Sequence, residues 1–142
     1  MRIAWVVAAV VLGVAGCSSP PDYTPAPGTL VAGTAQLTVN GQNIGKTEAV
    51  QCTPAGSLTT ITTGDQASGV TALISNKDEL TTEAVGINNV GGFTGSYNRG
   101  LGGEAKVTMT GRTYDITGTA DGFATANPSF RTSGTFAIKV AC

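Results

Sequence analysis

Residues 36–41 read QLTVNG, and this stretch decides the fold class. Its first four residues alternate between polar and apolar side chains, which is typical of a half-buried β-strand. The Asn40-Gly41 pair that follows is favoured in the type I′ turn of a tight hairpin, because Asn and Gly tolerate a positive φ. We therefore predict a β-hairpin here, with a returning strand from Ile44 to Cys52.

The same character continues to the end of the chain. Runs of β-branched residues alternate with Gly and Asn, which predicts further short strands separated by turns. No segment shows a sustained helical period, although a short helix is conceivable over residues 120–127. We expect an all-β fold of about seven to eight short strands, arranged as a single antiparallel sandwich or half-barrel over residues 34–142. The expected strands after the first hairpin are 57–63, 69–75, 79–87, 105–110, 113–117 and 134–140.

Composition limits the functions open to this domain. The chain has 142 residues, a formal net charge of −1, 12% charged residues and no histidine. The missing histidine excludes Ser-His-Asp and Cys-His catalysis and histidine-ligated metal centres. The low charge and the absence of a basic run argue against nucleic-acid binding. A Ser-Lys or paired-carboxylate enzyme is compatible with this composition, since Asp65, Glu83 and Asp115 could meet, but nothing in the spacing favours one. We therefore expect no enzyme, no metal site and no nucleic-acid partner.

Two motifs resemble ligand-binding sites, but each lacks a feature that such a site requires. Residues 91–96 read GGFTGS, but a phosphate-binding loop would end in Lys-Ser or Lys-Thr and lead into a helix. Asp78, Glu79 and Glu83 form a small acidic cluster that lacks the oxygen-ligand pattern of a calcium loop. We interpret both as parts of ordinary turns and strands.

The N-terminus has the features of a signal peptide. Arg2 precedes an apolar run over residues 3–16. A helix of that length reaches about 21 Å at roughly 1.5 Å per residue, less than the ~30 Å hydrocarbon core of a bilayer. We therefore assign residues 1–16 to a leader that is removed, and not to a lasting membrane span.

The end of this run identifies the kind of leader. Val14-Ala15-Gly16-Cys17 resembles the bacterial lipobox, in which small residues enter the peptidase cleft and a cysteine thiol takes a diacylglyceryl thioether. Cleavage before Cys17 frees its amine for a third acyl chain, and two or three chains anchor a protein stably. The alternative is an ordinary signal peptide that contains a cysteine. Apart from this covalent lipid on Cys17, we expect no cofactor.

Residues 17–33 are then an acylated cysteine and a flexible Pro/Thr-rich tether. Four of the six prolines lie here, which favours an extended segment without a core of its own. The tether would hold the domain at the extracytoplasmic face of the cell membrane. Its hydroxyl side chains either accept O-linked sugars or belong to an unmodified spacer.

Two cysteines remain after Cys17 is assigned to the lipid. In an exported protein Cys52 and Cys142 either pair with each other or stay as free buried thiols. A disulfide would close a loop of about 90 residues, worth roughly 4 kcal/mol in the chain-entropy model.

Together with the lipobox and tether, several segments give the chain a specific family resemblance. They include residues 37–41 (LTVNG), 50–52 (VQC), 85–92 (VGINNVGG), 114–120 (YDITGTA), 126–128 (ANP) and 138–142 (IKVAC). With these segments in this order, nearly the whole chain resembles the mycobacterial nineteen-kilodalton lipoprotein antigen family. This resemblance implies a cell-envelope lipoprotein acylated at Cys17, and immune stimulation through recognition of that acylated cysteine by Toll-like receptor 2. It also places the family's cysteine pair at Cys52 and Cys142.

Two hypotheses for the folded domain follow, besides a purely structural envelope protein. The first is a non-catalytic display or interaction module that meets host or envelope partners. The alternative is a carrier that binds a lipid or glycolipid in an apolar cleft of the β domain. The carrier hypothesis predicts that a set of apolar side chains faces a void: Val70, Leu73, Val85, Ile87 and Phe93.

Overall fold

The computed structural model describes residues 27–65 and 67–142. The predicted leader, the lipobox with Cys17 and the first part of the tether lie outside the described residues. The described chain contains no helix that is long and apolar enough to cross a membrane.

The all-β class is confirmed, with ten strands in the described residues in place of the seven to eight expected. The strands are β1 (Ala35–Val39), β2 (Gln42–Thr47), β3 (Val50–Ala55), β4 (Leu58–Gly64), β5 (Gly69–Ser75), β6 (Thr81–Val90), β7 (Phe93–Asn98), β8 (Ala105–Thr110), β9 (Thr113–Ala124) and β10 (Arg131–Ala141).

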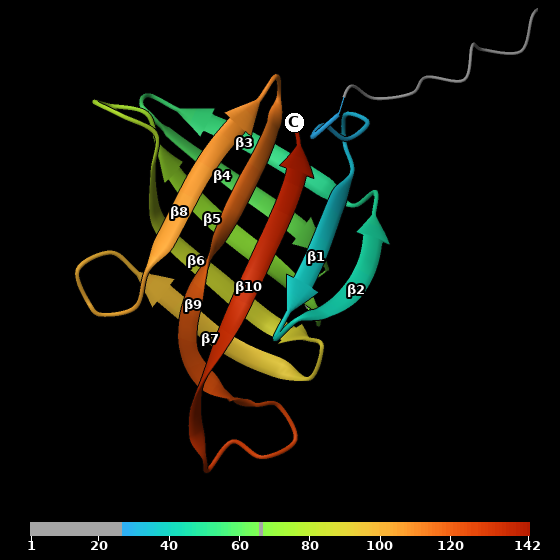
Figure 1. The fold of residues 1–142 in the computed structure, drawn as a ribbon, viewed down its shortest axis with the longest axis vertical. Coiled ribbons are helices and arrows are strands. Elements are labelled where there is room, and N and C mark those ends of the chain that lie inside the picture. Colours follow the sequence, from blue (N-terminus) through green and yellow to red (C-terminus); the bar gives the residue numbers. More distant parts are fainter. Residues whose placement is uncertain (1–26, 66) are drawn as a thin grey trace, which may run out of the picture.

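One antiparallel sheet joins all ten strands in the order β2-β1-β10-β9-β7-β6-β5-β4-β3, and β8 pairs with β9. Figure 1 shows that the sheet curls over itself, so that β1, β2, β8, β9 and β10 face β3 to β7. β9 makes this turn possible, because residues 113–118 pair with β8 and residues 121–124 pair with β7. The result is a nearly closed, barrel-like sheet with its core between the two facing layers.

Strand alternation fills that core. In β1 the apolar residues Ala35, Leu37 and Val39 are buried and the residues between them are half-exposed. The same alternation places side chains from the other strands opposite them. The largest fully buried side chains are Ile61, Ile74, Ile116, Val39, Val85 and Val140.

The predicted hairpin turn at residues 40–41 is confirmed. Asn40 has φ 53° and Gly41 has φ 75°, as a type I′ turn requires. The turn is also bonded to β10, since the Thr135 N–H donates to Asn40 Oδ1 (3.0 Å) and the Asn40 N–H donates to the Thr135 carbonyl oxygen (2.8 Å).

Asn40→Ala should lower the free energy of unfolding by about 1 to 2 kcal/mol. Alanine loses the side-chain hydrogen bond, worth about 1 kcal/mol, and is strained by roughly another 1 kcal/mol at positive φ. Asn40→Gly is the matched control, because it loses the bond without the strain and should cost less than alanine. Urea unfolding followed by far-UV circular dichroism measures both variants. An equal loss in the two would contradict a contribution from the left-handed backbone.

The predicted returning strand Ile44–Cys52 is wrong. The structure divides it into β2, which pairs with β1, and β3, which pairs with β4 at the other end of the sheet order. Glu48 and Ala49 separate the two strands, and the Gly64 N–H donates to the Ala49 carbonyl oxygen (3.0 Å). The chain therefore leaves one layer for the other at a point that no Gly or Pro marks.

The short helix considered for residues 120–127 is also wrong. β9 continues to Ala124, because residues 113–123 pair with β10 and residues 121–124 pair with β7 as well. The glycine-rich stretch 91–103 contains a further strand, β7, which the sequence analysis left out. In both places, pairing on the two sides of a strand overrides local propensity.

Candidate functional site

The end of the predicted tether is bonded to the domain. The Gly33 N–H donates to the Ala141 carbonyl oxygen (2.9 Å), and the Leu30 N–H donates to Thr113 Oγ1 (3.1 Å). These bonds fix the incoming chain beside the start of β9 and the end of β10. The chain that leads into β1 therefore joins the fold at one defined end.

A disulfide lies at the same end of β10. Cys52 in β3 is joined to Cys142, the residue after β10, with an S–S distance of 1.97 Å and a Cα–Cα distance of 5.9 Å. β3 is the last strand of the sheet order, and β10 belongs to the opposite layer. The bridge thus holds the two facing layers together where no strand pairing does so.

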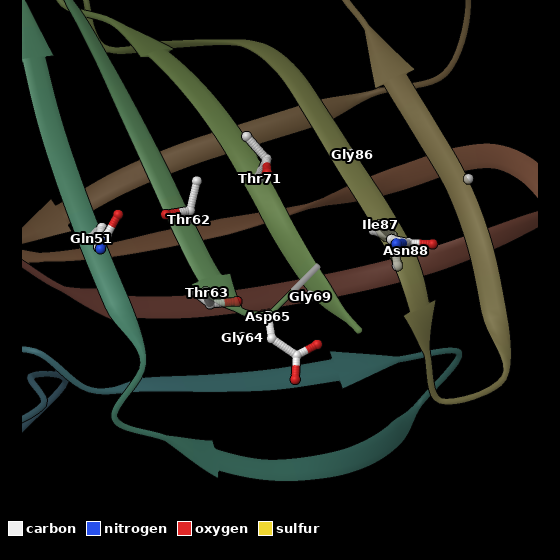
Figure 2. Close-up of a pocket in the computed structure, with 11 residues that line it drawn as sticks. Gln51, Thr62, Thr63, Gly64, Asp65, Gly69, Thr71, Gly86, Ile87 and Asn88 are labelled. Carbon is white, nitrogen blue, oxygen red and sulfur yellow. The ribbon is translucent and has the colours of Figure 1, made fainter. Parts of the chain in front are cut away.

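A trough with a volume of about 610 Å³ lies on the surface of the β3–β6 layer. Figure 2 shows Gln51, Thr62 and Thr71 on three neighbouring strands, with Gly86 on the fourth. These four residues form one continuous row across the sheet, since each is the register partner of the next. Glycine at the end of the row leaves the backbone uncovered and deepens the trough.

The trough offers hydroxyl and amide groups and little charge. The carboxylate of Asp65, the charged residue in its lining, accepts bonds from the backbone N–H groups of Ala67 and Ser68, both 2.9 Å. Asp65 therefore stabilises its own turn. The lining suits hydrogen bonds to neutral polar groups. The sequence analysis did not identify this row, because its members come from four strands and meet only through pairing.

Four of the five positions named for the lipid carrier pack in the hydrophobic core, although Ile87 also borders the polar surface trough. Val70, Val85, Ile87 and Phe93 are buried within the hydrophobic core, while Leu73 is half-buried between two inward-facing residues of β5. The carrier hypothesis therefore finds no support in the packing.

The motifs that resemble ligand sites have structural roles. Gly91 and Gly92, with φ values of 60° and 73°, make the turn between β6 and β7. Asp78 and Glu79 lie in the loop between β5 and β6. Glu83 forms an ion pair with Arg99, with Oε1 and Nη1 3.1 Å apart.

Within the part of the chain that the structure describes, two threonine hydroxyls are buried in the core without a hydrogen-bond partner, and this predicts a stabilising substitution. Thr63 and Thr82 are 3% and 2% exposed, and neither Oγ1 has a hydrogen-bond partner among the described residues. Thr63→Val keeps the shape and removes an unpaired polar atom, so we expect a gain of about 0.5 to 2 kcal/mol in unfolding free energy. Thr59→Val, at a half-buried site on the same strand, is the control and should change little. A loss of stability in Thr63→Val, measured by urea unfolding, would contradict an unpaired hydroxyl.

Comparison with known proteins decides the family. The model of the Mycobacterium 19 kDa lipoprotein antigen family matches residues 28–142, which is the whole β domain with the end of the tether. The chain belongs to this family. The resemblance noted in the sequence is thereby confirmed.

Relatives in the family are similar along most of their length. A putative lipoprotein of Mycobacterium indicus pranii is 36% identical, with all of both chains covered. Lipoprotein LpqH of Mycobacterium tuberculosis strain H37Rv is 34% identical, over 95% of this chain and 92% of its own. Lipoprotein LpqH of Mycobacterium avium is 37% identical, over 78% of this chain and 69% of its own.

Membership in the 19 kDa antigen family implies a membrane-associated protein of the cell envelope. The family and these relatives are named as lipoproteins or lipoprotein antigens, and not for a catalytic activity. The part of the chain that matches the family, residues 28–142, contains all ten strands described above.

Proposed function

We propose that this protein is a lipid-anchored lipoprotein held at the extracytoplasmic face of the cell membrane through Cys17. The observation that carries the proposal is the Val14-Ala15-Gly16-Cys17 sequence directly after an apolar leader, in a chain of a lipoprotein antigen family. A diacylglyceryl thioether on Cys17, with or without a third acyl chain on its amine, supplies the anchor.

The β domain acts as a non-catalytic display and interaction module. Its filled core, its disulfide and its bonded tether end support a rigid body that presents surfaces to partners. The row of Gln51, Thr62, Thr71 and Gly86 in the trough is uncharged, and a neutral polar partner is able to form hydrogen bonds there.

Immune stimulation is assigned to the acylated N-terminus. The host partner is a pattern-recognition receptor, Toll-like receptor 2, which would bind the acyl chains on Cys17. Receptor activity should therefore depend on the lipid and not on the folded state of residues 34–142.

Cys17→Ala tests the anchor. The variant should leave the membrane fraction, because it lacks the thiol that carries the lipid, and its partitioning into detergent should fall by at least about 100-fold. Fractionation and intact-mass measurement of the full chain, expressed in a mycobacterial host, provide the readouts. Ser18→Ala is the matched control and should retain both the lipid mass and the membrane location. Membrane retention of Cys17→Ala at unchanged mass would refute the proposal.

The same preparations test the assignment to the receptor. Cells that carry Toll-like receptor 2 should respond to the acylated wild-type protein and not to Cys17→Ala. An acylated variant with a disrupted fold should remain active. If Cys17→Ala stimulated the receptor as well as the wild type, the β domain would have to be the recognised part.

A further inference from the structure

The link between the anchor and the fold is short. Nine residues, 18–26, separate Cys17 from the described chain. Even fully extended, the connection from Cys17 to residue 27 spans at most about 36 Å, at ~3.6 Å per residue. Residue 30 is the first residue bonded to β9, so residues 27–29 raise the maximum reach from Cys17 to the bonded chain to about 47 Å, at ~3.6 Å per residue. The domain must therefore stay close to the lipid surface that holds Cys17.

The link joins one end of the long axis. Figure 1 shows the incoming chain, the C-terminus and the turn between β8 and β9 together at this end, which we call the anchor end. The opposite end holds the β6–β7 turn and the loop between β9 and β10. That far end is one connected structure, because the Thr125 N–H donates to the Gly92 carbonyl oxygen (2.9 Å).

The side chains of the anchor end suit a lipid headgroup layer. The tip of the β8–β9 hairpin, residues 109–114, contains Arg112 and no Asp or Glu, while the paired strands farther from the turn carry Lys106 on β8 and Asp115 on β9. Arg112 is exposed and forms no ion pair with the described residues. Two apolar side chains at this end are also exposed: Val31 at 45% and Met109 at 42%. Basic and apolar groups side by side bind anionic lipid surfaces by charge and by shallow burial.

We propose that the anchor end lies on the lipid surface that holds Cys17, so that the far end, with the exposed Phe130, points away from the membrane. This inference rests on the proposed anchoring. It adds an orientation in which Val31, Met109 and Arg112 contact lipid headgroups. The far-end turns then form the surface that meets partners first.

The tryptophan and cysteine content of the chain allows site-specific fluorescence and coupling experiments. Its single tryptophan, Trp5, lies in the leader, and Cys17 is the one cysteine outside the disulfide. Residues 17–142 are coupled through Cys17 to a maleimide lipid in vesicles of phosphatidylcholine and phosphatidylglycerol. A tryptophan is then introduced at the anchor end in Met109→Trp, or at the far end in Phe130→Trp. Lipids brominated near the glycerol quench a tryptophan that touches the headgroup layer.

Met109→Trp should lose roughly half of its emission on brominated vesicles, and Phe130→Trp should keep its emission, because such contact is shallow and local. Val31→Trp is a second anchor-end probe if Met109→Trp folds poorly. Equal quenching of the two ends, or stronger quenching of Phe130→Trp, would overturn the orientation. Vesicle flotation verifies the coupling in every sample. Since the coupling is chemical, failure of cellular acylation at Cys17 appears only in the fractionation experiment.

Discussion

In Gly122→Ala, the free energy of unfolding should fall by more than about 3 kcal/mol. A Cβ at Gly122 would overlap the Thr94 carbonyl oxygen and the Gly95 Cα, and it would lie 2.8 Å from the Thr94 carbonyl carbon. All of these atoms are backbone, so no side chain is able to rotate away. Gly122 pairs with β7 on one side and β10 on the other, which leaves β9 no room to shift.

Gly86→Ala is the matched control for Gly122→Ala. It is also a glycine in an extended strand, but the nearest atom to its Cβ would be the Thr71 carbonyl oxygen at 3.9 Å. Its stability should stay within about 0.5 kcal/mol of the wild type or rise slightly. Urea unfolding of residues 17–142, followed by far-UV circular dichroism, compares the two. A Gly122→Ala variant as stable as Gly86→Ala would contradict the close approach of β7 and β9.

Removal of the disulfide should have the second large effect. In the double variant Cys52→Ala, Cys142→Ala, the unfolding free energy should fall by roughly 4 to 5 kcal/mol, because the unfolded chain regains the freedom of a loop closed across a 90-residue separation. For a domain of this size, the midpoint of thermal unfolding should drop on the order of 20 °C. Both quantities are measurable by circular dichroism.

Chemical reduction provides the control for the cysteine substitutions. Wild-type protein unfolded in the presence of dithiothreitol should match the double variant, whereas dithiothreitol should leave the double variant unchanged. If reduction altered wild-type stability by less than about 1 kcal/mol, the unfolded chain would already be compact enough to make the bridge redundant.

The strands that end at clear turn residues were predictable from sequence. The boundaries expected for 69–75 and 105–110 agree with β5 and β8, since a turn residue follows each strand: Asn76 after β5 and Gly111 after β8. The Asn40-Gly41 turn was predictable for the same reason. In these segments the local backbone preference and the final pairing agree.

β7 and the second half of β9 were not predictable in this way. Glycine lowers strand propensity, so Gly95 and Gly122 argued against strands. In the structure these two residues are register partners, and their missing side chains let β7 and β9 approach. The surface trough was not predicted for a related reason. Gln51 and Gly86 belong to the same row of residues only after β3, β4, β5 and β6 have paired. The anchor proposed at Cys17 rests on a local motif, which is readable in the sequence without any strand pairing.

The disulfide also changes what the molecule does under mechanical load. Consider a partner that binds the loop near Phe130 while Cys17 is anchored in the membrane as proposed. A force that separates the two would be carried by the shortest covalent connection between Phe130 and Cys17. That path crosses from Cys52 to Cys142, so it contains about 47 residues instead of about 113. At ~3.5 Å per residue, the maximum extension falls from about 400 Å to about 165 Å. With Cys17 anchored as proposed, the disulfide would limit the maximum distance between the membrane and the bound partner to about 165 Å, even if the strands unfolded under force.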